Sequence, residues 1–124
     1  MTRATQALTV LAMLAPFPAS AQFAVSDWVL AQWRGGAYYY PATVLRTDAT
    51  TVTIEYDDGA RETRPVNQVK HYNWKLGSKV ECRWTDGAWY GASITAMGGD
   101  AVTLDILYDD GTAQRTMTKR CRSL

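Results

Sequence analysis

The sequence contains few of the residue types that most often carry catalysis or hold a metal ion. One histidine, His71, and two cysteines, Cys82 and Cys121, occur in 124 residues. They form no Cys-x-x-Cys or His-x-x-x-His pair, and no glycine-rich phosphate loop follows a strand and opens a helix. No serine or cysteine can be paired with a base from the sequence. We therefore expect no metal site, no cofactor and no enzymatic activity, and we place His71 in a linker.

An excess of charge of one sign is also absent. The chain has 13 basic and 12 acidic residues, for a formal net charge of +1. Affinity for nucleic acids comes mainly from neutralising phosphates, so a nearly neutral chain is not expected to be a general nucleic-acid binder. The one basic cluster, Lys119 to Arg122, is interpreted as a solvated strand end.

No apolar run is long enough to span a membrane. The longest, Ala7 to Phe17, has 11 residues, against roughly 20 for a spanning helix. Arg3 precedes it, and Pro18-Ala19-Ser20-Ala21 follows with the small-x-small pattern of a cleavage site. We interpret residues 1–21 as a secretory signal peptide of bacterial type rather than a short membrane anchor. The mature chain would begin at Gln22, be secreted or periplasmic, and carry 12 basic and 12 acidic residues.

The remaining chain is an internal repeat. Trp33 and Trp84 are 51 residues apart, and Tyr56 and Tyr108, each followed by Asp-Asp-Gly, are 52 apart. The repeat divides the mature chain into residues 24–72 and residues 74–124.

Each copy has the period-two pattern of β-strands. Val52, Ile54 and Tyr56 alternate with more polar neighbours, as do Val80 and Cys82 in the second copy. Turn signals such as Asp-Gly separate the runs. We therefore predict an all-β fold, with four or five antiparallel strands per copy curled into a small barrel. So small a barrel is marginal alone, so the two are expected to pack together through Tyr72, Trp74 and Trp28. The other aromatic residues Tyr38, Tyr39 and Trp89 are expected on outer strand faces.

These motifs resemble the Tudor domains, a group of methyl-residue readers. The likeness lies in a tryptophan followed by a tyrosine six or seven residues later, and in an apolar strand that ends in Tyr-Asp-Asp-Gly. It covers Trp33–Val44 and Val52–Arg61 in the first copy, and Trp84–Ile94 and Leu104–Gly111 in the second. The resemblance implies two SH3-like, Tudor-type barrels in tandem after the signal peptide.

The resemblance also implies an aromatic cage for a methylated Lys or Arg in each copy. Many family members have another aromatic residue or an Asn after the turn, where this chain has Ala60 and Thr112. Stacked rings hold a poorly hydrated cation by cation–π attraction, and a rim carboxylate accepts a hydrogen bond from any remaining N–H. The matching residues are Trp33, Tyr40, Tyr56 and Asp58 in the first copy, and Trp84, Tyr90, Tyr108 and Asp110 in the second.

The same residues also have a purely structural interpretation. Tyr56 and Tyr108 share a face with core residues, so core packing and a cage role both remain open for them. Aspartates followed by glycine also make good turns without any ligand.

In the SH3-like barrel that the resemblance implies, the first and last strands are antiparallel neighbours. Cys82 aligns with Ala31, and Cys121 aligns with Val69. We therefore expect an apolar Ala31–Val69 contact in the first copy and a Cys82–Cys121 disulfide in the second. Export favours the disulfide over the alternative of two buried thiols.

Two functions remain under consideration. One is a non-enzymatic module that captures a basic or methylated peptide, or a small quaternary ammonium ligand. The other is a structural or protein-interaction module of the cell envelope that has no ligand cage and binds through sheet edges or the inter-barrel cleft.

Overall fold

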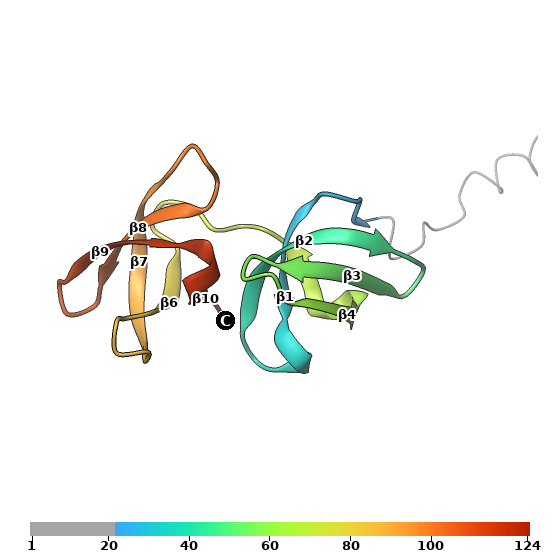
Figure 1. The fold of residues 1–124 in the computed structure, drawn as a ribbon, viewed down its shortest axis with the longest axis horizontal. Coiled ribbons are helices and arrows are strands. Elements are labelled where there is room, and N and C mark those ends of the chain that lie inside the picture. Colours follow the sequence, from blue (N-terminus) through green and yellow to red (C-terminus); the bar gives the residue numbers. More distant parts are fainter. Residues whose placement is uncertain (1–21) are drawn as a thin grey trace, which may run out of the picture.

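The computed structural model describes residues 22–124, which form two five-stranded antiparallel sheets (Figure 1). Each sheet curls around its own core, and the described residues contain strands and short 3-10 turns but no α-helix. The prediction of two SH3-like barrels in tandem is confirmed. The predicted signal peptide, residues 1–21, lies outside the described residues.

The first barrel has the strand order β4-β3-β2-β1-β5. Val52, Ile54 and Tyr56 point into its core, as their period-two spacing predicts. The 3-10 turns η2 (Trp33–Gly35) and η3 (Val66–Gln68) follow β1 and β4. The strands are β1 (Trp28–Gln32), β2 (Tyr39–Thr47), β3 (Thr51–Tyr56), β4 (Arg61–Pro65) and β5 (Val69–His71).

The second barrel repeats this plan in the order β10-β6-β7-β8-β9. The 3-10 turn η4 (Thr118–Arg120) leads into its last strand. Gly59 and Gly111 end equivalent turns at φ of 94° and 92°, a region that glycine enters without steric cost. The strands are β6 (Lys79–Arg83), β7 (Trp89–Met97), β8 (Thr103–Tyr108), β9 (Ala113–Met117) and β10 (Cys121–Arg122).

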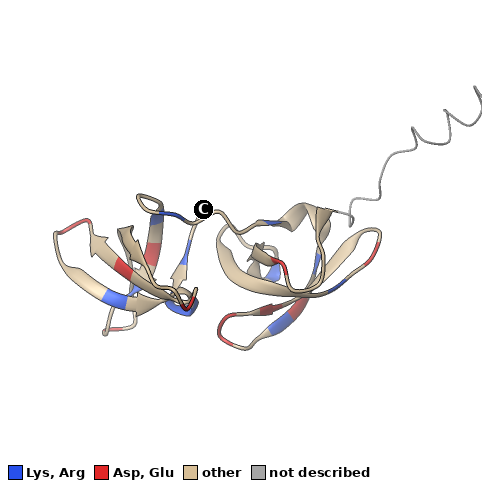
Figure 2. Ribbon diagram, turned by 90° about the horizontal axis from the view of Figure 1, so that it is seen from above, with Lys and Arg blue, Asp and Glu red and all other residues tan. Residues whose placement is uncertain are grey.

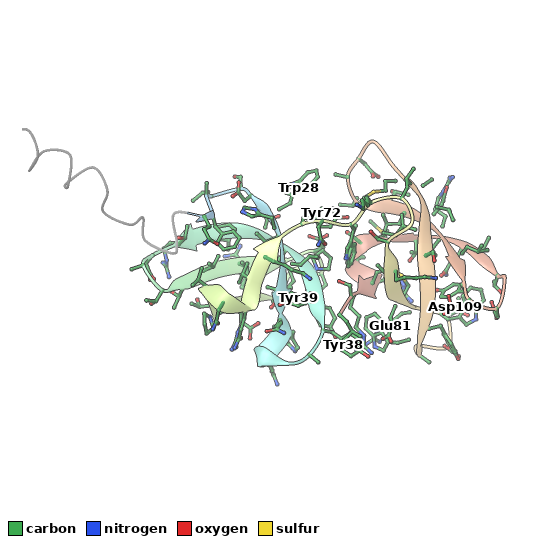
Figure 3. The ribbon with its side chains drawn as sticks, turned by 180° about the vertical axis from the view of Figure 1, so that it is seen from behind. Trp28, Tyr38, Tyr39, Tyr72, Glu81 and Asp109 are labelled. Carbon is green, nitrogen blue, oxygen red and sulfur yellow. A yellow bond between two sulfur atoms is a disulfide. The ribbon has the colours of Figure 1, made fainter. Side chains whose placement is uncertain are left out.

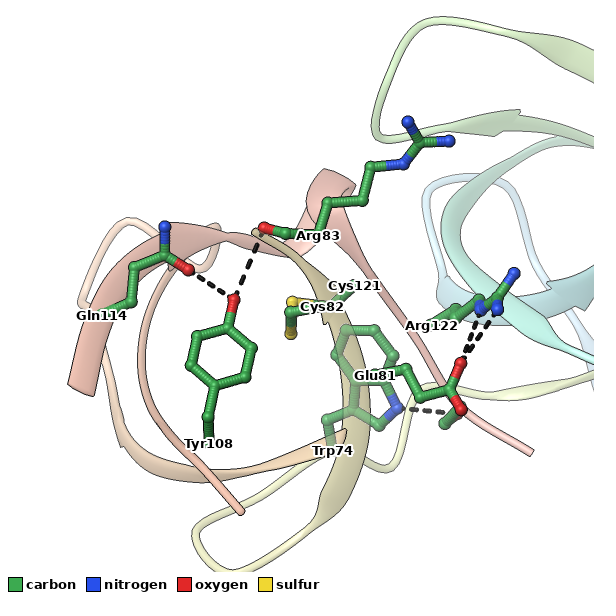
Figure 4. Close-up of a disulfide and its surroundings, with 9 residues drawn as sticks. Trp74, Glu81, Cys82, Arg83, Tyr108, Gln114, Cys121 and Arg122 are labelled. Atoms are coloured by element: carbon green, nitrogen blue, oxygen red, sulfur yellow. Dashed lines mark hydrogen bonds and ion pairs between the residues drawn. A yellow bond between two sulfur atoms is a disulfide. The ribbon is translucent and has the colours of Figure 1, made fainter. Parts of the chain in front are cut away.

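Each barrel closes where its last strand pairs with its first. Ala31 lies opposite Val69 in the first barrel, and Cys82 lies opposite Cys121 in the second. The two cysteines are joined by a disulfide within the second core (Figure 4). The predicted pairing is therefore confirmed, with a covalent bond in one barrel where the other has an apolar contact.

The two barrels share an apolar interface. Leu30, which the alternation of β1 predicts to point away from the first core, is fully buried in the core cluster of the second barrel with Trp74. The Trp74 ring lies 5.5 Å from that of Tyr72, and its Nε1–H donates to Ser123 Oγ at 3.0 Å. The expected packing through Tyr72 and Trp74 is thus present, and Figure 3 shows Tyr72 beside Trp28 at this junction.

The segment after η4 ties both barrels together. β10 pairs with β6, and the next residue, Ser123, exchanges two backbone hydrogen bonds of 2.7 and 3.0 Å with Tyr39 of β2. Strand β10 lies between the two barrels in Figure 1. This connection fixes the barrels against each other by backbone as well as by side-chain contacts.

Two predictions about this junction are wrong. Tyr38, Tyr39 and Trp89 are not outer strand residues, because each is half-buried and Tyr38 and Tyr39 lie between the barrels (Figure 3). The basic cluster is not simply a solvated strand end, because the Arg122 guanidinium lies 3.8 Å from the Tyr38 ring and 4.1 Å from the Trp89 ring.

His71 is likewise misplaced by the sequence interpretation. It is the last residue of β5, and its ring lies 4.7 Å from that of Phe23. The strand continues to this residue because it pairs with Val29 of β1.

Candidate functional site

The second barrel has an aromatic hollow of about 390 Å³, called here the second pocket, that contains all four residues predicted for its cage. The Tyr108 ring stands nearly perpendicular to the rings of Trp84 and Tyr90, at centroid distances of 5.6 and 6.4 Å. Tyr108 is 4% exposed and Tyr90 45% exposed. Tyr108 thus forms the floor, with the other two rings as walls.

Three carboxylates, from Asp86, Asp109 and Asp110, line this second pocket, and none of its described lining residues is Lys or Arg. The Tyr90 hydroxyl donates to Asp86 Oδ2 at 2.6 Å, and this hydrogen bond lowers the pKa of Asp86. The backbone N–H of Thr112 donates to Asp110 and lowers the pKa of that carboxyl too. Both groups therefore carry a negative charge throughout the neutral range.

The Asp109 carboxylate occupies the space beside Gly91 that a side chain at this position would fill. A Cβ built at Gly91 would lie 2.6 Å from Asp109 Oδ2. The equivalent residue of the first barrel is Pro41, so the two barrels differ at this rim. Asp109 also lies 3.9 Å from the Lys79 ammonium, a weak contact between two exposed groups.

The first barrel has a larger hollow of about 620 Å³, called here the first pocket, which also contains its four predicted residues. The Tyr56 ring stands nearly perpendicular to those of Trp33 and Tyr40, at 5.4 and 6.4 Å. The aromatic arrangement of the second pocket is therefore repeated here.

The floor tyrosines belong to the cores and to the pockets at once. Tyr56 and Tyr108 are each 4% exposed and contribute to their core clusters. Tyr56 donates to Glu62 at 2.7 Å, and Tyr108 donates to Gln114 at 2.5 Å (Figure 4). Burial raises the pKa of both phenols, so both remain neutral donors.

The first pocket lies at the junction of the barrels, and the second barrel supplies one of its walls. Arg122 donates to the Tyr40 hydroxyl at 3.1 Å and forms an ion pair with Glu81 at 2.9 Å (Figure 4). Burial lowers the pKa of Arg122, but these two partners raise it above its ordinary value. The second-barrel residues that line the first pocket are Arg83, Trp89, Lys119, Arg120 and Arg122.

Sequence reasoning missed this wall and also Asp86. A repeat alignment compares equivalent positions within each copy, so it carries no information on contacts between copies. Asp86 belongs to an Asp-Gly turn, a pattern that indicates only a turn, although its position four residues before Tyr90 is a usable signal.

Residues 22–124 provide neither a metal-binding group nor a membrane-spanning helix. This part of the chain has no group of three or more His, Cys, Asp or Glu residues placed to hold a metal ion. Nor does any helix in it have the length and hydropathy needed to span a membrane. Basic and acidic positions are interspersed over both barrels (Figure 2).

Comparison with known proteins agrees with the repeat architecture. Residues 25–71 match the family model described as the DNA repair protein Crb2 Tudor domain. The solved tandem Tudor domains of Crb2 resemble the chain with a TM-score of 0.53 and 17% identity, covering 80% of this chain and 78% of that one. The first barrel thus matches a Tudor family model, and the chain has a tandem Tudor-like fold.

Two tandem Agenet structures are also similar at low identity. Domains 3-4 of ADCP1 give a TM-score of 0.42 at 15% identity, covering 86% of this chain and 83% of that one. The AGD34 unit of Arabidopsis thaliana AGDP1 gives 0.43 at 16% identity, covering 86% and 85%. No curated protein matches the chain significantly.

Proposed function

We propose that this tandem Tudor-like protein is a non-enzymatic binding module that captures a methylated ammonium or guanidinium group in the second pocket. The observation that carries the proposal is the combination of three aromatic rings with three carboxylates and no basic side chain among the described lining residues. The Tudor-like fold supports the same conclusion, since the family it resembles includes methyl-residue readers.

The chemistry of the second pocket suits a weakly hydrated cation. Each ring face offers cation–π attraction of about 0.5 to 2 kcal/mol. Asp110 and Asp86 add negative charge at the rim and accept a hydrogen bond from a remaining N–H, which favours lower methylation states over the fully methylated one.

The predicted export narrows the candidates for the ligand. A secreted or periplasmic protein would meet methylated or basic side chains of envelope proteins and small quaternary ammonium compounds. Mass spectrometry of the secreted protein should find an N-terminus at Gln22, and an intact Met1 in that material would remove the compartment argument.

The test is a titration with choline and with a dimethyl-lysine peptide, followed through the indole N–H signals of the five tryptophans. We expect both ligands to shift the Trp84 signal. Trp84→Ala should weaken binding measured by calorimetry about tenfold or more. Trp28→Ala is the control, because Trp28 is 54% exposed and lies outside both pockets.

Trp84 also packs against the core, so its loss could act through folding. Tyr90→Ala provides a second variant, because Tyr90 is exposed and its hydroxyl bonds only to Asp86 in the pocket. A folded Tyr90→Ala protein that still binds choline at full strength would refute the cage.

The alternative is a structural or interaction module of the envelope without a ligand cage. The shared apolar interface and the β10 connection favour it, because they make the tandem a rigid unit. This alternative is supported if neither choline nor the dimethyl-lysine peptide perturbs any tryptophan signal.

A further inference from the structure

The first pocket differs from the second in the charge that surrounds its rings. Arg122 is paired with Glu81, but Arg83, Lys119 and Arg120 also line the pocket and have no carboxylate partner in it at ion-pair distance. Two carboxylates, from Asp57 and Asp58, face them. The charged residues that line the first pocket therefore carry a net positive charge and disfavour a simple cation, whereas the charged residues that line the second pocket are all carboxylates.

One of the two carboxylates of the first pocket, Asp57, already has a hydrogen-bond partner in the second barrel. Asp57 accepts a hydrogen bond from the Thr118 hydroxyl at 2.5 Å. Desolvation raises the pKa of Asp57, and that hydrogen bond opposes the rise. Because Lys119 and Arg120 directly follow Thr118 in η4, this bond also holds the two cations at the pocket.

The aromatic wall continues from the cage to the cations. The Trp89 ring lies 6.1 Å from the Tyr40 ring, and the Arg83 guanidinium lies 4.9 Å from Trp89. Arg120 is held on the same side by a 3.5 Å contact from Nη2 to the Trp84 carbonyl oxygen. One pocket thus has an aromatic half with Asp58 and a cationic half, a combination that neither a simple cation nor a simple anion satisfies.

We propose that the first pocket binds a zwitterion in which a methylated ammonium is linked to a phosphate. The ammonium lies against Trp33, Tyr40 and Tyr56, and the phosphate lies against Arg83, Lys119 and Arg120. Guanidinium and ammonium groups bind phosphate through charge-assisted hydrogen bonds, and several cations suit an anion that carries up to two charges. The inference rests on the proposed function for the chemistry of the rings, but it concerns the other pocket.

Phosphocholine is the probe. Two compounds serve for comparison: choline, which lacks the phosphate, and phosphoethanolamine, which lacks the methyl groups. We expect phosphocholine to shift the Trp33 and Trp89 indole signals with an affinity about tenfold higher than that of choline or phosphoethanolamine. Trp84 should show the opposite order, with choline preferred. Equal responses of Trp33 to choline and phosphocholine would overturn the proposal.

A charge variant tests the phosphate half directly. Arg83→Gln combined with Lys119→Gln should weaken phosphocholine binding about tenfold at Trp33 and leave choline binding at Trp84 intact. Arg46→Gln combined with Lys75→Gln is the matched control, because it removes the same charge from exposed residues outside both pockets. Unchanged phosphocholine binding by the first variant contradicts the assignment.

The outcomes separate this inference from the proposed function. If choline does not shift the Trp84 signal of the wild-type protein but phosphocholine shifts those of Trp33 and Trp89, only the function proposed for the second pocket is refuted. If choline shifts the Trp84 signal but phosphocholine does not shift those of Trp33 and Trp89, only the zwitterion site is refuted. Sedimentation with phosphatidylcholine vesicles then distinguishes the source. Co-sedimentation supports a lipid headgroup, and binding of free phosphocholine without co-sedimentation supports a soluble zwitterion.

Discussion

Tyr40 and Tyr90 hold the same position in the two barrels, but their hydroxyl groups have partners of opposite charge. Tyr90 donates to the carboxylate of Asp86, whereas Tyr40 accepts from the guanidinium of Arg122. The difference arises because the first pocket faces the other barrel and the second does not. The two copies thus share the rings, and the packing of one copy on the other determines what surrounds the rings of the first pocket.

The largest expected effect concerns how each barrel is closed. Cys82→Ala combined with Cys121→Ala should lower the free energy of unfolding by about 3 to 4 kcal/mol, because a loop of 39 residues is no longer cross-linked. Thermal denaturation measures this loss. Hydrogen exchange should show that amides of the second barrel lose more protection than those of the first, which closes through Ala31 and Val69.

Thiol counting is the accompanying control. Denatured, unreduced wild-type protein should contain no free thiol, and two free thiols per chain would contradict the disulfide.

The next effect concerns the junction that makes the pockets different. Arg122→Gln should cost about 1.5 to 3 kcal/mol of stability, since it removes a half-buried cation bonded to Glu81 and Tyr40. Arg115→Gln is the matched control. Its ion pair with Asp105 is largely exposed and screened by solvent, so its loss should lower the melting temperature much less than the loss of Arg122. Equal melting temperatures for the two variants would argue against a structural role for the junction.

A smaller effect is expected at the rim of each pocket. Asp110→Asn should weaken choline binding at Trp84 about twofold to fivefold, with nearly unchanged melting, because Asn can still accept the Thr112 N–H hydrogen bond. Asp58→Asn is the equivalent change in the first pocket, where it should reduce phosphocholine binding less, since the phosphate contacts remain. A large loss of stability from either change would show that these aspartates act mainly in their turns.

The smallest effect is in the pH dependence. Hydrogen bonds from Tyr90 and from the Thr112 backbone hold the pKa of Asp86 and of Asp110 below the ordinary value of an aspartate, so both carboxylates stay charged in mild acid. Choline binding at Trp84 should therefore stay constant as the pH falls from 7 to about 5, and decline only in stronger acid, where the two groups become protonated. The pKa of Asp57 is raised, so it should titrate first. Carboxyl carbon NMR shifts measure this order.

The repeat made the fold and the aromatic residues predictable. Strand alternation, the Asp-Gly turns and the alignment of Cys82 and Cys121 with Ala31 and Val69 describe contacts inside one barrel, which both copies share. The contacts between the barrels could not be predicted in this way, because equivalent residues of the two copies have different partners there. Leu30 and Glu81 are equivalent in sequence, yet Leu30 packs with Trp74 while Glu81 binds Arg122. Such contacts depend on how the copies dock, which periodicity alone does not encode.

The closing strand pairs also determine how the chain can fold. Ala31 meets Val69 across 38 positions and Cys82 meets Cys121 across 39, so neither barrel is complete until residues distant in sequence have met. Chains dominated by such non-local pairing fold in milliseconds to seconds rather than microseconds. Ser123 joins Tyr39 of the first barrel from the end of β10. The last residues of the chain thus serve both barrels: they close the second one and pair with the first one, so closure of the second barrel and assembly of the first pocket depend on the same strand.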